Sequence, residues 1–257
     1  LLDLMYNTKG VSHKLSFQPT YTTRISTSGT SYEYDGRKNK LEYIISNNLL
    51  GFYNLSGIDF LRKNADMNGT IADKEVYSIF TEFRFEPLNN TNVDASVRRE
   101  YDSNYDIFDT GRIQVNHKLL RSMILRGSLG TGYRTPTPYE LYSSYGNTNL
   151  TPEKSVSFDF GSEINLNKNK STFYLGIFET KVEDIITYAS SKYRQSTANL
   201  KTYGLESRFK TRLYDNFTAS LNYTKTNGKE NDGDSITLVP KDKVIISLNY
   251  TPNKKVN

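Results

Sequence analysis

Hydrophobic and polar residues alternate with a period of two along much of this chain. Hydrophobic residues occupy mainly the even positions of 155–164 and the odd positions of 217–224, and similar alternation recurs in 123–134, 203–210 and 244–250. Successive side chains of a β-strand point to opposite faces of the sheet. The pattern therefore predicts strands with one apolar and one polar face.

Weaker alternation extends this prediction over the rest of the chain, and no segment has a convincing helical period. The pattern and the turn residues together predict about thirteen strands. The less regular ones are expected at 39–47, 55–63, 74–86, 92–101, 110–119 and 170–181, with two more within 13–34.

The connections between these strands alternate between short and long over most of the chain. Short turns are expected at 87–91, 120–121, 167–169 and 214–216, and longer linkers at 64–73, 102–109, 134–153, 182–200 and 227–241. Barrels of the outer membrane have short turns at one end and long loops at the other. The pattern favours an all-β fold, a transmembrane antiparallel up-and-down β-barrel.

The positions of the charged residues agree with a barrel. An arginine or lysine facing lipid costs roughly 2–4 kcal/mol at the bilayer midplane, so charges are expected on the lumen face or near strand ends. The polar faces carry Arg126, Asp159, Glu163, Glu206 and Arg208, while Glu179 and Lys181 share an apolar face near the loop end of their strand.

Four tyrosines on the apolar faces are candidates for an interfacial aromatic belt. They are Tyr133, Tyr203, Tyr223 and Tyr250. Aromatic rings gather at both surfaces of the bilayer, although tyrosine is also common in ordinary strands.

The composition suits a sheet with one apolar face and one face in contact with water. Of the 257 residues 36% are hydrophobic, and none is Cys, which excludes disulfides and thiolate metal sites. No apolar run approaches the roughly 18 residues of a transmembrane helix. The net charge of +5 comes from Lys and Arg spread along the chain, which argues against a nucleic-acid-binding stripe.

Candidate catalytic and metal-binding chemistry is sparse. The two histidines, His13 and His117, are far apart in the sequence, and they give a Ser-His-Asp arrangement no specific support. The acidic run 230–235 lacks the calcium-loop pattern with its closing glutamate, and an ordinary solvated loop explains it better. We therefore expect no enzyme, cofactor or metal site.

The stretch 131–155 interrupts the strand pattern with prolines and tyrosines. Pro136 and Pro138 cannot donate to a ladder, so pairing must end near Tyr133. We expect a long ordered loop over the lumen mouth. It carries three further tyrosines, Tyr139, Tyr142 and Tyr145. Either the loop braces the rim by local packing, or its tyrosines contact a ligand.

This region resembles the barrel of TonB-dependent outer-membrane receptors. Such barrels carry a segment close to Gly-Thr-Gly-Phe-Arg-Ala-Pro-Thr, then Glu-Leu-Tyr, then Gly-Asn-Pro-Asn-Leu-Lys-Pro-Glu-Lys-Ser. The corresponding segments here are GTGYRTPT at 130–137, ELY at 140–142 and GNTNLTPEKS at 146–155. The departures are Thr135, Pro138, Thr148 and Thr151, which bear on loop details. Weaker similarity covers most of the chain.

The resemblance implies a piece of a larger receptor. Such receptors have an N-terminal plug domain and a barrel of about 22 strands, so residues 1–257 are expected to be a partial barrel domain without the plug and the terminal strands. The implied activity is energy-coupled uptake of a scarce ligand, such as a ferric siderophore or cobalamin, through the bacterial outer membrane. The implied partners are TonB with its inner-membrane energising complex, the ligand and outer-membrane lipid.

The resemblance and the strand pattern together indicate where ligand and plug would bind. The expected substrate-binding residues are Arg134, Tyr139, Tyr142, Tyr145, Asn147 and Asn149. The expected plug-facing residues of the lumen are Arg126, Glu163, Glu206 and Arg208. The rival interpretations are a passive porin, a barrel enzyme and a soluble β-rich binding protein.

Overall fold

The structure, a computed structural model, describes residues 1–26, 32–49, 51–67, 69–166, 170–196, 198–230, 234–235 and 240–251. This part of the chain forms sixteen strands and one short helix. The strands are β1 (Leu2–Thr8), β2 (Val11–Ser26), β3 (Tyr32–Leu49), β4 (Phe52–Met67), β5 (Thr70–Leu88), β6 (Thr91–Asp102), β7 (Asp106–Leu120), β8 (Met123–Arg134), β9 (Glu153–Leu166), β10 (Ser171–Glu183), β11 (Ile186–Ala189), β12 (Lys192–Gln195), β13 (Leu200–Tyr214), β14 (Phe217–Glu230), β15 (Asp234–Ser235) and β16 (Asp242–Tyr250). The helix is α1 (Pro138–Tyr142).

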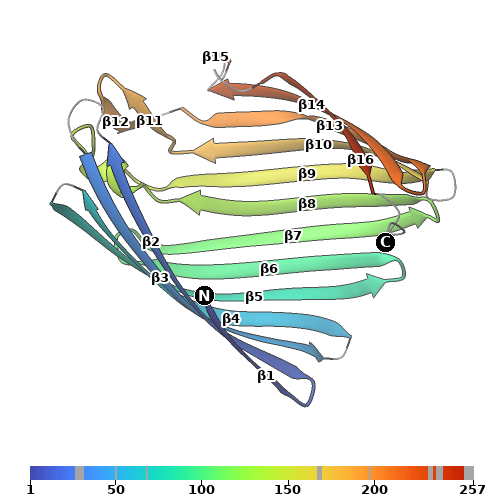
Figure 1. The fold of residues 1–257 in the computed structure, drawn as a ribbon, viewed down its shortest axis with the longest axis horizontal. Helices are drawn as coiled ribbons and strands as arrows, with labels where there is room; N and C mark the ends of the chain where they lie inside the picture. The colour runs from blue at the N-terminus through green and yellow to red at the C-terminus, as the bar shows by residue number, and fades with distance from the viewer. Residues whose placement is uncertain are drawn as a thin grey trace, which may run out of the picture.

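One antiparallel sheet contains all strands except β11 and β12, which form a separate hairpin (Figure 1). Strands β1 to β10, β13 and β14 follow one another in sequence order, and both β15 and β16 pair with β14. Among the described strands β1 pairs only with β2, so the sheet is an open, strongly curved wall. The predicted up-and-down antiparallel architecture is confirmed.

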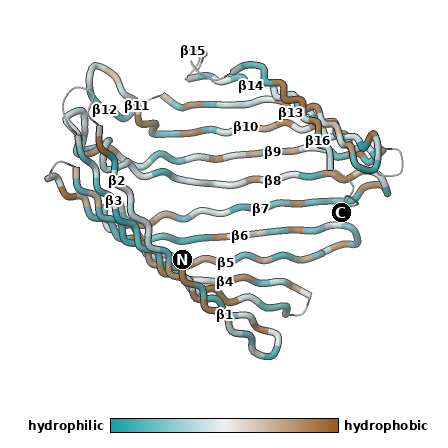
Figure 2. Tube along the Cα trace, in the orientation of Figure 1, coloured by the Kyte–Doolittle hydropathy of each residue, from teal (hydrophilic) through white to brown (hydrophobic). Residues whose placement is uncertain are grey.

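Cross-strand pairing aligns the alternating apolar and polar residues of neighbouring strands over the whole sheet. Phe160 lies opposite Ile177 of β10, and Asp159 lies opposite Ser128 of β8. Because directly opposite residues share a face, apolar residues gather on one face and polar residues on the other, and the colours alternate along the strands in Figure 2. We call the face of Phe160 the outer wall and the face of Asp159 the lumen face. Large side chains more than one-third exposed on the outer wall include Leu129, Phe158, Ile177, Phe209 and Leu221.

An aromatic row marks where the apolar part of the outer wall ends on β4 to β6. Phe60 and Tyr77 have ring centroids 4.9 Å apart, and Tyr77 and Tyr101 have centroids 6.4 Å apart. Two residues further along β4 and β5, Arg62 and Glu75 form an ion pair of 3.7 Å. An aromatic girdle followed by charged residues is typical of a bilayer surface.

Two predicted linkers are strands instead. The segment 64–73 belongs mostly to β4 and β5, and 102–109 is interrupted only by a turn at residues 103–105. Beyond the aromatic row the outer face of these strands is polar, as at Arg62 and Glu75, while the buried Ala65, Met67 and Val76 lie on the lumen face. The apolar residues thus change face there, which obscures the alternation that identifies a strand in the sequence. In addition, β1 at Leu2–Thr8 was not predicted, and 13–34 holds β2 and only the start of β3.

Turn geometry explains the tight connections at the end opposite α1. The Lys9–Gly10 and Asn89–Asn90 turns place Gly10 at φ 79° and Asn90 at φ 65°. Glycine and asparagine tolerate this left-handed backbone best, and hairpins of two residues require it. In the described part of the chain no helix is long and apolar enough to cross a membrane.

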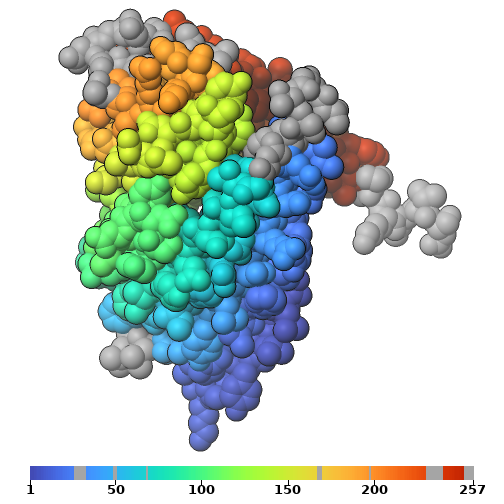
Figure 3. Space-filling model, turned by 90° about the vertical axis from the view of Figure 1, so that its left-hand side faces the viewer, coloured from blue at the N-terminus to red at the C-terminus, as the bar shows by residue number. Residues whose placement is uncertain are grey.

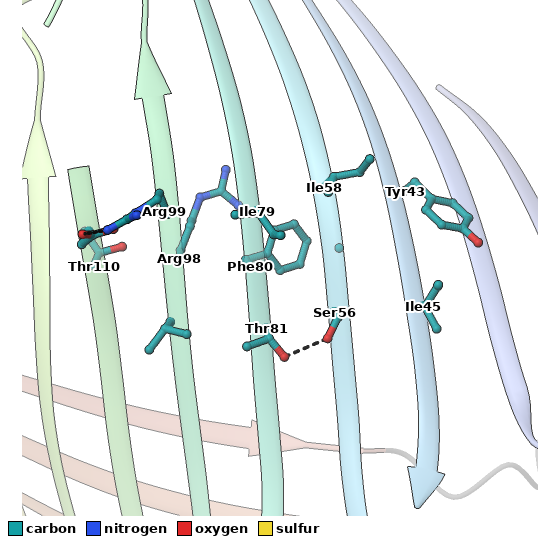
Figure 4. A pocket seen from close by; sticks show the side chains of 13 residues that line it. Tyr43, Ile45, Ser56, Ile58, Ile79, Phe80, Thr81, Arg98, Arg99 and Thr110 are labelled. Carbon is teal, nitrogen blue, oxygen red and sulfur yellow. Dashed lines mark hydrogen bonds and ion pairs between the residues drawn. The ribbon is translucent and has the colours of Figure 1, made fainter. Parts of the chain in front are cut away.

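The outer wall also has charged residues and a hollow. Arg99 donates to both oxygens of Asp109 at 2.7 Å, and Lys201 lies 2.9 Å from Glu179. A hollow of about 710 Å³ lies beside Arg99, between aliphatic side chains such as Ile58 and Ile79 (Figure 4). These side chains belong to the face that meets lipid in a barrel, so the hollow is not the candidate site for an aqueous ligand.

Candidate functional site

The rim loop, which we define as residues 135–152, is built around α1. The Thr137 hydroxyl accepts from the Glu140 amide at 3.2 Å, and the Glu140 carboxylate accepts from the Thr137 amide at 2.7 Å. This reciprocal capping box satisfies two amides that a helix start leaves unpaired, and Pro138 fits the first turn. Leu141 and Leu150 are buried, so the loop has its own small core.

Arg134, the last residue of β8, holds the base of the rim loop. Its Nε and Nη2 donate to the two carboxylate oxygens of Glu153 at 2.6 and 2.7 Å. Its Nη1 donates to Glu140 at 3.0 and 3.2 Å. A planar guanidinium suits such forked contacts. All three nitrogens therefore have partners within the protein, and the expected ligand contact of Arg134 stays a prediction.

The charge of Glu140 is maintained by its surroundings. Burial of this carboxyl acts to raise its pKa, but the hydrogen bonds from Arg134 and Thr137 outweigh burial and hold the pKa of Glu140 below its ordinary value. The carboxylate is consequently ionised at neutral pH and available to Arg134.

The hairpin β11–β12 is tied to the rim loop by its backbone. The Tyr193 amide donates to the Tyr145 carbonyl at 2.9 Å, and the Asn147 side chain donates to the Tyr193 carbonyl at 3.2 Å. The Thr151 amide donates to the Gln195 side chain at 2.8 Å. Figure 3, which views this end of the molecule, shows the hairpin in orange beside the yellow-green rim loop.

Four rings form a cluster at this contact, which we call the tyrosine cluster: Tyr139, Tyr145, Tyr188 and Tyr193. Tyr139 and Tyr193 meet edge to face with centroids 6.1 Å apart, and Tyr145 meets Tyr188 at 5.8 Å. Tyr188 and Tyr193 complete the cluster at 5.3 Å. Tyr139 and Tyr145 are each more than one-third exposed, so the cluster packs locally and still presents aromatic surface.

The structure thus separates the predicted substrate-binding residues into groups. Tyr139 and Tyr145 are in the tyrosine cluster, whereas Tyr142 lines a different pocket further along α1. Asn147 links the loop to the hairpin, and its side-chain oxygen accepts from the Asn149 amide at 3.0 Å. Contact of these residues with a ligand stays a prediction.

Sequence reasoning missed Tyr188 and Tyr193. The turn between their strands consists of Ser190 and Ser191, with φ of 52° and 61°. Two left-handed residues make a hairpin turn, but the usual sequence signal for it is Asn-Gly or Asp-Gly. The signal in the sequence that could have indicated this hairpin and its rings was the pair of tyrosines five residues apart within 182–200.

The lumen face carries a network of charges that the sequence did not reveal. Arg98 Nη2 donates to Asp59 and to Glu100, each at 2.7 Å, and to the Ser78 hydroxyl at 2.7 Å. Asp59 is buried, and its carboxylate also accepts from Ser78 at 3.2 Å. These residues lie on adjacent strands at one level of the wall, so only the register brings them together.

Tyr133 belongs to this network, and its predicted place on the lipid-facing side is wrong. Its hydroxyl donates to Glu100 at 2.6 Å, and its ring stacks on Phe108 with centroids 4.0 Å apart. The pairing of β7 with β8 ends at Arg112 and Gly130. Beyond it the Gly111 amide donates to the Thr131 hydroxyl at 2.9 Å, while β8 stays paired with β9 through Tyr133. The strand β8 therefore parts from β7 before Tyr133 is reached.

The four predicted plug-facing residues lie on the lumen face in two places. Arg126 of β8 and Glu163 of β9 form an ion pair of 3.3 Å. Arg208 donates to Asn222 at 3.1 Å, while Glu206, two residues away on β13, lies opposite Thr224. Their contact with a plug stays a prediction.

The histidines and acidic residues form no metal centre in the described part of the chain. Within these residues no group of three or more His, Asp or Glu side chains is arranged to hold an ion. The His117 ring contacts the Thr91 hydroxyl at 2.8 Å near a turn. The acidic run 230–235 lies largely outside the described residues.

A curved antiparallel wall with an apolar outer face, a charged lumen face and a braced rim loop defines one class of protein, the transmembrane β-barrel. The family model described as TonB dependent receptor-like, beta-barrel matches residues 2–255. The chain therefore belongs to the TonB-dependent receptor β-barrel family, and the resemblance seen in the sequence is confirmed.

Solved structures of receptors and transporters share this fold. A variant of the ferric enterobactin receptor PfeA from Pseudomonas aeruginosa matches with 14% identity and a TM-score of 0.77, covering 97% of this chain and 46% of that one. The copper transporter OprC matches with 16% identity and a TM-score of 0.76, covering 95% and 47%. The ferric yersiniabactin uptake receptor FyuA from Yersinia pestis matches with 14% identity and a TM-score of 0.73, covering 98% and 46%. This chain thus spans less than half the length of each.

Proposed function

We propose that the complete protein is a bacterial outer-membrane receptor that imports a scarce ligand, such as a ferric siderophore or cobalamin, by energy coupling through TonB. The observation that carries this proposal is a wall that is apolar outside and charged inside, with an ordered rim loop at one end. The similar structures are of a ferric enterobactin receptor, a ferric yersiniabactin uptake receptor and a copper transporter, and the two ferric chelates favour a siderophore.

In this proposal the rim loop and the lumen face have separate roles. The exposed rings of Tyr139, Tyr142 and Tyr145 contact the arriving ligand, and Arg134 keeps the loop in position for them. Asn147 and Asn149 shape the end of the same loop. Arg126, Glu163, Glu206 and Arg208 hold a plug domain through charge-assisted hydrogen bonds. No covalent step is required of this chain.

Growth of a receptor-deletion strain tests the proposal. On a panel of ferric siderophores and corrinoids at limiting concentration, the deletion strain should fail on at least one source, and the full-length gene should restore growth only when TonB is present. Restored growth without TonB would indicate a passive porin. Equal growth of deletion and parent strains on every source would contradict import altogether.

A further inference from the structure

Three lysines stand side by side on the lumen face near the rim loop. Lys38 of β3 lies directly opposite Lys63 of β4, and Lys63 lies directly opposite Lys74 of β5. Side chains in such positions start only about 5 Å apart, and like charges there are destabilising. The row therefore has an unfavourable electrostatic energy that a negative partner would relieve.

Among the described residues, only one of the three lysines has a negative partner. Lys74 Nζ lies 2.5 Å from the buried carboxylate of Asp102 and donates to the Thr135 hydroxyl at 2.6 Å. Within the described part of the chain Lys38 and Lys63 make no hydrogen bond or ion pair, and both are exposed. Two ammonium groups therefore face the lumen without a direct partner among the described residues.

The lysine row borders a pocket of about 330 Å³, which we call the lysine pocket. Four of its lining residues are basic and one is acidic; with the neighbouring polar groups they are Arg37, Lys38, Lys63, Lys74, Asp73, Asn104, Tyr105 and Tyr142. Helix α1 contacts β4 and β5, where the small residues Ala65 and Ala72 leave room for it. The size is within the usual range for small-molecule sites, about 300–1,000 Å³.

The composition of the lysine pocket indicates the charge of its occupant. Lysine ammonium groups are compact charges with three donors each, and the neighbouring Asn104 and the two tyrosines offer polar groups and aromatic faces. Burial raises the pKa of Tyr105 to about 12, with Tyr142 adding to the shift, so this phenol stays neutral and brings no competing negative charge. A ligand with two or more negative charges matches these surroundings.

We propose that the lysine pocket binds a small polyanion and that the imported ligand is an anionic metal chelate. This inference rests on the proposed function and deepens it. The lysine pocket is closed on one side by Thr135, Pro136 and α1, so it lies at the mouth, where an entering ligand arrives. That position favours a ligand over an acidic segment of the plug.

Binding to the purified full-length receptor tests the inference. The variant K38Q/K63Q removes the two unpaired charges, and K118Q/K210Q removes two lumen-face lysines at the opposite end of their strands as the matched control. The probes are a trianionic ferric tris-catecholate and a neutral ferric tris-hydroxamate. Quenching of the receptor's tyrosine fluorescence measures binding of each probe at low and at high salt.

K38Q/K63Q should weaken binding of the trianionic probe by about tenfold or more and reduce its salt dependence, whereas K118Q/K210Q should behave as the wild type. Unchanged binding of the trianionic probe to K38Q/K63Q overturns the inference. If binding is preserved and hydrogen exchange of the plug becomes faster in this variant, the lysines contact the plug instead. A wild-type receptor that binds only the neutral probe overturns it too, while the growth experiment still decides the proposed function independently.

Discussion

At the base of the rim loop, one guanidinium serves two carboxylates from different segments. Arg134 joins Glu153 at the start of β9 to Glu140 in α1, and Glu153 also accepts from the Ile186 amide at 2.8 Å. Strand, helix and the segment entering the hairpin therefore meet at one side chain. Lysine has no planar fork and cannot reproduce this arrangement.

We expect Arg134→Lys in the full-length receptor to loosen the rim loop. Losing part of the forked contacts should raise the exchange rate of the Leu141 and Ile186 amides roughly 5–30-fold, equivalent to about 1–2 kcal/mol. Arg208→Lys, on the lumen face, is the control and should leave both amides unchanged. Equal exchange in all three proteins would show that Arg134 does not hold the loop.

The pH dependence of the rim loop should follow from Glu140. Its pKa is lower in the folded loop than in the unfolded chain, so its contribution to stability is fully present above the unfolded pKa and is lost as the pH falls through the folded pKa. Exchange of the Leu141 amide, corrected for its intrinsic rate, should therefore rise only in acid, below the ordinary glutamate pKa of 4.5. Glu140→Gln should abolish this rise; the same acid response in that variant would assign it to another group.

The contacts of single residues were the hardest feature to predict from the sequence. Proline chemistry and the tyrosine content correctly indicated an ordered loop at 135–152. The lysine row and the Arg98 network depend on which residues of separate strands stand opposite one another, and register cannot be read from one strand alone. Tyr133 was misplaced because β8 parts from β7 before reaching it, and its ring then contacts Phe108 and Glu100.

At the scale of elements, α1 is too short to be stable alone. Its five residues are far below the roughly 12–15 that an isolated helix needs in water. The helix therefore depends on its capping box and on contact with β4 and β5. The sequence did not predict it, because five residues cannot display a helical period.

Thr137→Ala should destabilise α1 by about 1 kcal/mol, since it removes the acceptor for the Glu140 amide. Thr137→Ser, which keeps the hydroxyl, is the matched control. Hydrogen exchange of the Glu140 and Leu141 amides measures the difference. If both variants exchange alike, the capping hydroxyl contributes nothing to the loop.

Strand prediction succeeded within the apolar band and failed outside it. In 155–164 and 217–224 one face meets hydrocarbon, so every second residue is constrained and the strand is visible in the sequence. In 64–73 the strands continue where the outer face is polar and the apolar residues, such as Ala65 and Met67, lie on the lumen face. The strand β1 was missed for a different reason: Leu2, Leu4 and Tyr6 share its outer face, but Met5 interrupts the alternation within only seven residues.

At the scale of the whole molecule, the two faces should differ in how well they tolerate an introduced arginine. Leu221 is on the outer wall of β14, and Thr224 is on its lumen face opposite Glu206. Leu221→Arg should destabilise the full-length receptor in lipid vesicles by roughly 2–4 kcal/mol, and Thr224→Arg should have little effect. Urea unfolding measures both, and a larger loss for Thr224→Arg would reverse the assignment of the faces.

Retention of the plug should depend on the lumen charges. In the full-length receptor, Arg126→Ala combined with Glu206→Ala should speed hydrogen exchange of the plug by about tenfold or more, because charge-assisted hydrogen bonds are lost. The control, Arg62→Ala with Glu75→Ala, removes an ion pair from the outer wall. Plug exchange that is unchanged in the first variant would contradict the role of these residues.

The height of the wall has a consequence for what can approach the mouth. β5 runs for 19 residues, whereas a strand needs about 9–11 to cross hydrocarbon. The seven residues from Thr70 to Val76 lie beyond the aromatic row and raise this flank roughly 16 Å clear of the bilayer at a tilt near 45°. Bulky solutes that approach on the side of α1 would thus meet a stiff, hydrogen-bonded wall before they reach the mouth.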